Sequence, residues 1–313
     1  MIAVKNLTKQ YGNFTAVNNI SFDVDKGSIF GFVGPNGAGK TTTMRIMATL
    51  LTSTRGDIEI DGQSVFRDPR RTRRLIGYMP DFFGVYDDLR VSEYLEFYGE
   101  ASGCSVPEVR GMMPDLLELV GLSSKRDDFV NNLSRGMKQR LCLARTLIHQ
   151  PPVLILDEPA SGLDPRARVE LRNILRELQR MGKTIVISSH ILAELSQLCT
   201  HVGVISNGEM PLCGSITEIL ARVSGNAVIE AAVADRTEDA RLWLLEQQAV
   251  RDVNITNTGS LEFMFSGDKN QQAALLKELG NRFTLYSFTP RSGNLEEIFM
   301  QITEGSSNED SAH

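Results

Sequence analysis

The sequence predicts a layered α/β domain followed by a smaller α+β domain. The chain has 313 residues, more than one hydrophobic core usually organises. Strand-like and helical segments alternate up to about residue 210, which is typical of an α/β fold. After residue 225 the order becomes strand, helix, strand, strand, helix, strand, the split βαβ or ferredoxin-like arrangement. We therefore expect domains at 1–223 and 224–305, and a disordered polar tail at 306–313.

The elements of the first domain begin with the β-type segments MIAVKNL, SFDV and SIFGFVG, which precede the helical stretch KTTTMRIMATLL. Further along, the continuous apolar run VLIL is typical of a strand buried in a parallel sheet. In the second domain the predicted strands are AVIEAAVA, VRDVNIT, SLEFMFS and FTLYSFT, and the predicted helices are TEDARLWLLEQQ and KNQQAALLKELG. A last predicted helix, NLEEIFMQIT, precedes the tail.

The composition limits the function classes. A formal net charge of −6 argues against a protein that coats nucleic acid, so no nucleic-acid partner is expected. The basic run RDPRRTRRL is interpreted as a solvated face. The apolar runs are too short to span a bilayer, and the first residues lack the pattern of a secretory signal. We therefore expect a cytosolic chain, with reduced cysteines because their spacing is not that of a metal site.

The stretch GPNGAGKTT, at residues 34–42, matches the phosphate-binding pattern G-x-x-x-x-G-K-T between an apolar strand and a helix. Glycines let backbone N–H groups point at phosphate oxygens, and the helix N-terminus adds positive potential. Lys40 is expected to reach the β- and γ-phosphates, and the Thr41 hydroxyl to hold Mg²⁺. The residues predicted to bind nucleotide here are Gly34, Pro35, Asn36, Gly37, Ala38, Gly39, Lys40, Thr41 and Thr42.

Two acids follow the VLIL strand in the stretch PPVLILDEPASGLD. Because side chains alternate along a strand, Asp157 and Glu158 should face different ways. Asp157 is predicted to orient the Mg²⁺ shell, and Glu158 to polarise the attacking water as a general base.

With the phosphate loop, the LILDEP strand and the loop LSRGMKQR together, residues 1 to about 223 resemble the ATP-binding subunit of ABC transporters of the bacterial exporter type. The resemblance implies the family's P-loop ATPase fold, with ATP and Mg²⁺ as its ligands. It also implies a second ATP-binding subunit, expected to be another copy of this chain, with a different chain as the alternative.

The resemblance also explains why a second anion-binding loop exists. In the family this signature loop caps the ATP held by the other subunit, so residues 133–137 would present Ser134, Gly136 and backbone N–H groups to a partner's γ-phosphate. Taken alone, Ser134 is also an ordinary helix N-cap, and the two interpretations are compatible.

Three further residues take roles from the resemblance. Tyr11 matches the aromatic residue that stacks on adenine, Asp164 in SGLD matches the loop that communicates between subunits, and His190 matches the histidine that senses the γ-phosphate. Without the family pattern, ordinary packing would be the preferred interpretation for Tyr11, and a bystander role for His190.

The sequence departs from the family pattern at three positions. Asp81 stands where most members have a glutamine that ligands Mg²⁺; an aspartate can also ligand Mg²⁺ but is shorter and anionic. The signature loop has Arg135 in place of a glycine and Met137 in place of a glutamine. These changes bear on the turnover rate rather than on the fold.

Two function classes follow from these motifs. In the first, the chain is the ATP-hydrolysing motor of an exporter, peripheral on the inner face of the plasma membrane through separate integral membrane permease subunits. The alternative is an ABC-type ATPase that acts on a soluble target. The aromatic-rich segment 81–103 favours the first, because exporter members contact their membrane partner there, although internal packing of Phe82, Phe83, Tyr94 and Phe97 explains it almost as well. The second domain is expected to steady the dimer or to regulate it.

Overall fold

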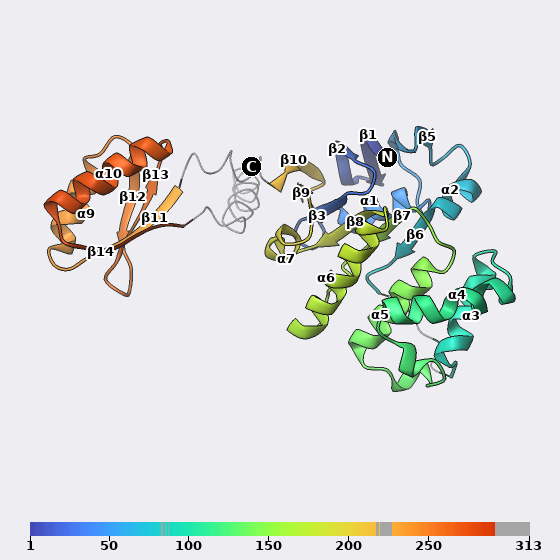
Figure 1. The fold of residues 1–313 in the computed structure, drawn as a ribbon. Coiled ribbons are helices and arrows are strands. Elements are labelled where there is room, and N and C mark those ends of the chain that lie inside the picture. The colour runs from blue at the N-terminus through green and yellow to red at the C-terminus, as the bar shows by residue number, and fades with distance from the viewer. Residues whose placement is uncertain (83, 85, 87, 217–218, 220–226, 292–313) are drawn as a thin grey trace. The chain divides into compact units, whose positions relative to one another are not determined.

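The computed structural model describes residues 1–82, 84, 86, 88–216, 219 and 227–291 (Figure 1). The chain divides into two compact units, one of Met1–Gly214 and one that begins at Ser215. The expected domain boundary at 223/224, the expected last helix and the polar tail lie outside the described residues and stay predictions.

A six-stranded sheet with the order β10-β9-β3-β8-β7-β6 is the centre of the first unit. Its neighbouring strands from β9 to β6 run parallel, as the alternation of strands and helices predicts. The VLIL strand is buried over its whole length, as its continuous apolar run indicates. The strands are β3 (Ile29–Val33), β6 (Ile76–Met79), β7 (Val153–Leu156), β8 (Thr184–Ser189), β9 (His201–Ser206) and β10 (Glu209–Ser215).

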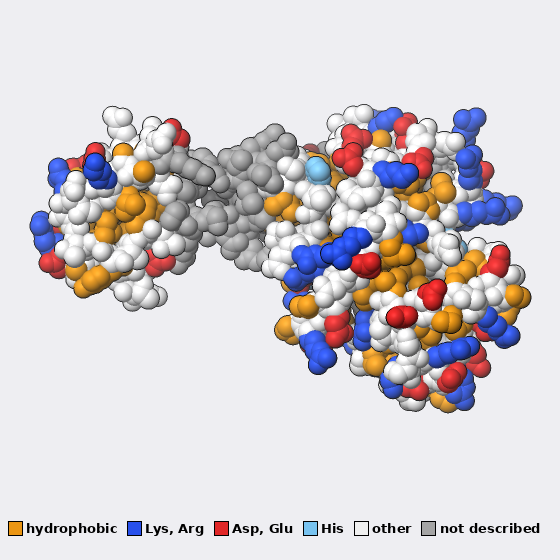
Figure 2. Space-filling view, in the orientation of Figure 1, with side chains coloured by type: hydrophobic (Ala, Val, Ile, Leu, Met, Phe, Trp, Pro, Cys, Tyr) orange, Lys and Arg blue, Asp and Glu red, His pale blue; other side chains and the backbone are white. Residues whose placement is uncertain are grey.

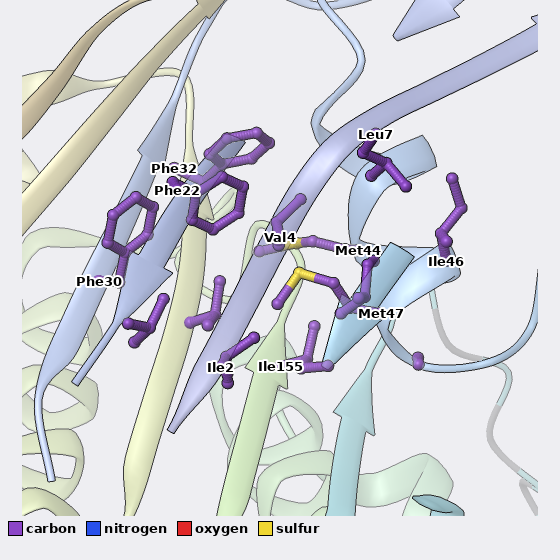
Figure 3. Packing of buried hydrophobic residues seen from close by; sticks show 14 of the residues in the cluster. Ile2, Val4, Leu7, Phe22, Phe30, Phe32, Met44, Ile46, Met47 and Ile155 are labelled. Atoms are coloured by element: carbon purple, nitrogen blue, oxygen red, sulfur yellow. The ribbon is translucent and has the colours of Figure 1, made fainter. Parts of the chain in front are cut away.

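A second sheet, antiparallel and with the order β2-β1-β4-β5, packs on the same core. Phe22 of β2 stacks on Phe30 of β3 with ring centroids 4.9 Å apart, which ties the two sheets together (Figure 3). Met44 and Met47 of α1 (Lys40–Met47) are fully buried in this cluster, so the helix that follows the phosphate loop is anchored in it. The strands are β1 (Ile2–Tyr11), β2 (Phe14–Val24), β4 (Arg55–Ile60) and β5 (Gln63–Ser64).

Helices make up the rest of the first unit. One group, α3 (Val91–Ala101), α4 (Val106–Leu119) and α5 (Arg135–Leu147), packs together beside the strands (Figure 1). The others are α2 (Pro69–Leu75), α6 (Pro165–Arg180), α7 (Leu192–Ser196), and the short 3₁₀ turns η1 (Ser123–Lys125) and η2 (Val130–Asn132). The arginines of the basic run on and before α2 are all exposed, as predicted for a solvated face. Over the described ranges, no helix combines the length and the apolarity that a membrane crossing requires.

The second unit has the element order that the sequence predicts. Its antiparallel sheet has the order β12-β13-β11-β14. Leu261, Phe263 and Phe265 alternate along β13 and are buried in the core of this unit, and Trp243 packs against that core. The elements are β11 (Ala227–Val233), α9 (Thr237–Leu245), β12 (Val250–Ile255), β13 (Leu261–Phe265), α10 (Lys269–Arg282) and β14 (Leu285–Arg291).

Candidate nucleotide-binding site

The phosphate loop at residues 34–42 connects the buried strand β3 to α1. Gly37 has φ +83° and Gly39 has φ +109°, values that L side chains rarely adopt. A Cβ on Gly39 would lie 2.5 Å from the Ala16 carbonyl oxygen, and one on Gly34 would lie 2.3 Å from the Ile205 carbonyl oxygen. The loop therefore needs its glycines both for its backbone shape and for its close packing on neighbouring strands.

Lys40 is held inside the loop rather than extended into solvent. It is 5 % exposed, and its Nζ donates to the carbonyl oxygens of Gly34, at 2.6 Å, and Pro35, at 3.1 Å. The same ammonium lies 3.3 Å from Glu158 Oε1. The loop thus encloses a cation, and the arrangement concentrates positive charge where phosphate oxygens would be bound.

Glu158 links the phosphate loop to the end of β8. Its Oε2 lies 2.9 Å from His190 Nδ1, and its Oε1 faces Lys40. The His190 side chain is 46 % exposed, whereas that of Glu158 is 11 % exposed. The carboxylate therefore stands between a buried cation and a histidine that solvent or a ligand can reach.

Asp157 and Glu158 point to different partners, but strand alternation is not the cause. β7 ends at Leu156, and Glu158 has φ +49°, in the left-handed region. A non-glycine residue there carries strain of about 1–2 kcal/mol. The chain turns at this residue, so Asp157 stays against the sheet while Glu158 reaches toward Lys40 and His190.

Asp157 is fully buried and hydrogen-bonded on one side. The Ser188 hydroxyl donates to its Oδ1 at 2.8 Å. Burial raises the pKa of Asp157; the Ser188 and Thr41 hydroxyls oppose that rise, while the negative charges of Asp81 and Glu158 add to it. Its Oδ2 has no hydrogen-bond partner within the described part of the chain. A cation at Oδ2 would offset the penalty of burying this carboxylate.

The residues around Asp157 fit a Mg²⁺ ion. Mg²⁺ is usually held by one or two carboxylates together with substrate phosphates, rather than by an all-protein cage. Among the described residues, one buried oxygen of Asp157 has no hydrogen-bond partner, and both Thr41 and Asp81 act on the pKa of this carboxyl. No group of three or more His, Cys, Asp or Glu side chains suited to a metal occurs among the residues that the structure describes.

Sequence reasoning missed Ser188. This serine is 1 % exposed in β8; its Oγ accepts from the Glu158 backbone N–H at 2.8 Å and donates to Asp157 at 2.8 Å. One side chain therefore orients both acids. The available signal was a hydroxyl at the end of the otherwise apolar run TIVIS.

The signature loop and the SGLD loop lie at the starts of two helices. Ser134 is the N-cap of α5 and accepts from the Met137 N–H at 3.3 Å. Asp164 is the N-cap of α6 and accepts from the Ala167 N–H at 2.9 Å. A Cβ on Gly136 would lie 3.3 Å from Ala167 Cβ, so the two helix starts pack closely.

Some predicted site residues are not brought to the phosphate loop. Within the described ranges, no hydrogen bond or ion pair joins Ser134, Asp164 or Tyr11 to residues 34–42. Tyr11 ends β1, is 48 % exposed, and has Lys9 Nζ 5.0 Å from its ring centroid. The Tyr11 ring is thus partly exposed, so a ligand can reach it.

Comparisons with known proteins agree with this geometry. The family model described as ABC transporter matches residues 17–161, and the model described as ATP-binding protein DrrA1-3-like, C-terminal domain matches residues 214–303. The linearmycin resistance ATP-binding protein LnrL of Bacillus subtilis is 31% identical over 308 residues, covering 97% of this chain and 98% of that protein. A Nod factor export ATP-binding protein I of Paraburkholderia xenovorans is 36% identical over 304 residues, covering 96% of each chain.

Comparison with a solved structure supports the same fold for the first unit. A bacterial ABC transporter cassette with a dimeric structure superposes with a TM-score of 0.63 at 26% identity, covering 69% of this chain and 99% of that one. The fold and the site define a P-loop ATPase of the ABC class. The chain belongs to the ATP-binding subunits of ABC transporters, in the DrrA/NodI-like exporter group, and it is the ATP-binding motor of such an exporter. The C-terminal unit is the DrrA1-3-like domain of that group, with an antiparallel sheet.

Proposed function

We propose that two copies of this chain close head to tail on two ATP molecules, and that hydrolysis at Glu158 reopens the dimer to drive export by separate membrane-spanning subunits. The observation that carries the proposal is the arrangement of the Glu158 carboxylate between Lys40 Nζ, at 3.3 Å, and His190 Nδ1, at 2.9 Å. A general base must lie within hydrogen-bond reach of the proton that it accepts, and this carboxylate has one oxygen directed to each neighbour.

Each residue of the site then has a task. The N–H groups of residues 34–42 and the Lys40 ammonium hold the β- and γ-phosphates, and Tyr11 stacks on the adenine. Glu158 takes the proton of the attacking water, and His190 orients that carboxylate and contacts the γ-phosphate. Asp157, Thr41 and Asp81 would hold Mg²⁺, which neutralises phosphate charge when it is bound.

The second copy completes the site. Ser134 caps α5, which directs the N–H groups of its first turn outward, and no acidic residue lies in that turn. In the closed dimer this helix start would face the γ-phosphate on the other subunit, and Asp164 would lie at the subunit boundary. Support comes from the dimeric cassette to which this chain is similar.

The contact with the membrane subunits is proposed for the segment 81–103. Tyr94 is fully buried, which fits internal packing, whereas Phe82 is 89% exposed and Phe97 is 47% exposed. Tyr86, 54% exposed, packs edge-on against Phe97 with ring centroids 5.4 Å apart. Phe83 lies outside the described residues. An exposed aromatic group of this kind suits a permease helix, and this contact would hold the chain on the cytoplasmic face of the membrane.

The C-terminal unit is proposed to be ferredoxin-like and to steady or regulate the dimer. Its element order and its sheet order, β12-β13-β11-β14, support this class. A ferredoxin-like fold hosts many roles. The proposed role of the C-terminal unit, to steady or regulate the dimer, therefore rests on the place of this domain in the chain of an exporter subunit.

The test is a pull-down of the tagged chain from detergent-solubilised membranes with ATP, using Glu158→Gln to trap the closed dimer. Recovery of a stoichiometric multi-spanning protein is expected. Recovery of soluble proteins or ribosomes alone would instead support an ABC-type ATPase with a soluble target. In parallel, purified wild-type chain must hydrolyse ATP faster than the Glu158→Gln variant.

A further inference from the structure

Arg135 is the first residue of α5, and its side chain reaches back to the SGLD loop of the same chain. Its Nη2 donates to the Ser161 carbonyl oxygen at 3.2 Å. Its guanidinium also covers Gly162, since a Cβ there would lie 2.2 Å from Arg135 Cζ. Gly162 has φ +67°, so both its backbone and its surroundings exclude a side chain.

A cation is unfavourable in this place unless a specific contact compensates for it. The positive end of the helix macrodipole repels an arginine at the first position, and the first turn of α5 contains no acid. The Ser161 carbonyl supplies a compensating acceptor. The guanidinium is therefore engaged within its own chain.

The contact between Arg135 and Ser161 is linked through the backbone to Glu158, the proposed general base. The Ser161 N–H donates to the Glu158 carbonyl oxygen at 3.0 Å, closing a tight turn behind the strained Glu158 backbone. One helical turn further along α5, Gln139 is buried, and its Nε2 donates to the Pro159 carbonyl oxygen at 2.6 Å. Two side chains of α5, Arg135 and Gln139, thus donate hydrogen bonds to backbone carbonyls of the turn 158–161.

From this geometry we infer that Arg135 is a positioning residue, which fixes the turn 158–161 in its own chain and so couples the signature loop to Glu158. The inference rests on the proposed function. In the head-to-tail dimer, α5 faces the partner's ATP while Glu158 serves the chain's own ATP, so the contact joins the two sites. Arg135 acts through Glu158 and does not itself bind the partner's phosphates.

Steady-state ATP hydrolysis by the full-length chain tests this assignment. Arg135→Gly is expected to lower kcat about three- to tenfold, with an unchanged KM for ATP. This is less than the full contribution of a charge-assisted hydrogen bond, because Gln139 still holds the turn through the Pro159 carbonyl. Arg135→Lys should recover part of the loss, because an ammonium can donate to one carbonyl but cannot lie flat over Gly162. Arg180→Gly is the matched control, an exposed arginine at the end of α6, and should leave kcat unchanged.

A double-mutant cycle separates positioning from folding. Gly162→Ala displaces the guanidinium, so it should lower kcat as Arg135→Gly does, and the double variant should be no slower than the slower single variant. Thermal unfolding of each variant checks that the fold is intact. Fully additive losses in kcat would overturn the coupling.

ATP-driven dimerisation provides the decisive comparison. The Glu158→Gln chain and the Glu158→Gln, Arg135→Gly chain should both dimerise with ATP, measured by light scattering. Loss of the dimer in the second would overturn the inference, because it would place Arg135 on the partner's nucleotide. If Arg135→Gly kept the wild-type kcat, the inference about Arg135 would be overturned, whereas the proposed function would still hold. If wild type were no faster than Glu158→Gln, the proposed function would fail, and this inference with it.

Discussion

Replacing Ser188 with alanine is the sharpest test of how the two acids are held. The Ser188 hydroxyl is buried, and it makes one hydrogen bond to Asp157 Oδ1 and another to the Glu158 N–H, each 2.8 Å long. Alanine removes a single oxygen, so it leaves no cavity of consequence. What it does leave is a buried carboxylate oxygen and a buried N–H that have lost their partner.

The size of the effect follows from these two contacts. A hydrogen bond to a charged group contributes about 1.5–3 kcal/mol, and an unsatisfied buried N–H costs about 1–3 kcal/mol. Because the two contacts share one atom and relax together, we expect the free energy of unfolding to fall by about 2–4 kcal/mol. Urea denaturation of the nucleotide-free chain measures this difference.

The contribution of Asp157 to folding stability depends on pH with a definite sign. Burial raises the pKa of Asp157 above its usual value of 3.8, so in the window between 3.8 and the raised value the folded chain binds the extra proton. Stability contributed by this group is therefore lost as pH rises through that window. Ser188 lowers this pKa, so Ser188→Ala should raise it further, and the acid limb of the ATPase rate should move to higher pH.

The control for this prediction is Thr146→Val. Thr146 is also buried, but its hydroxyl donates to the Cys142 carbonyl within α5, which already accepts a helical hydrogen bond. Its replacement should cost less than Ser188→Ala and should not move the acid limb. Equal stability losses in the two variants, with the same pH profile, would refute the reasoning about Ser188.

Three further outcomes are expected. Glu158→Gln should slow ATP hydrolysis by about two orders of magnitude or more, the usual contribution of a general base. ATP binding, measured by fluorescence titration, should persist. A loss in rate below about tenfold would argue for another base. Gly37→Ala, where φ is +83° but space is open, should cost about 1–2 kcal/mol in urea denaturation, and Gly39→Ala should cost about 1–3 kcal/mol more because its Cβ would meet the Ala16 carbonyl. Tyr11→Ala should weaken ATP binding by about 1–3 kcal/mol and Tyr11→Phe should preserve it, as calorimetry can determine; equal weakening would mean that the ring does not stack.

The sequence was sufficient for most of the fold because its signals are periodic and local. Strand β7 is a run of four apolar residues, and the phosphate loop places its glycines where the backbone needs positive φ. The C-terminal unit followed from the order of its segments, and its antiparallel sheet agrees with that order.

The site was less predictable where a single residue has a long-range contact. Ser188 is thirty residues or more from both acids in sequence, and its position at the end of an apolar run does not distinguish it from Ser189 beside it. The direction of Glu158 depends on one left-handed residue, which strand alternation does not anticipate. Arg135 could be recognised as unusual at a helix start, but its acceptor, the Ser161 carbonyl, is a backbone atom without sequence identity.

The parallel sheet explains why these separate signals meet. β3, β6, β7 and β8 run parallel, so their carboxyl ends meet at one edge, and Lys40, Asp81, Glu158 and His190 each follow one of them. At that edge the charges of Lys40 and Glu158 partly compensate one another through their ion pair. A bound phosphate would compete with Glu158 for Lys40, which would free this carboxylate for a water molecule. The left-handed backbone of Glu158 keeps its carboxylate at this edge, within reach of Lys40 and His190.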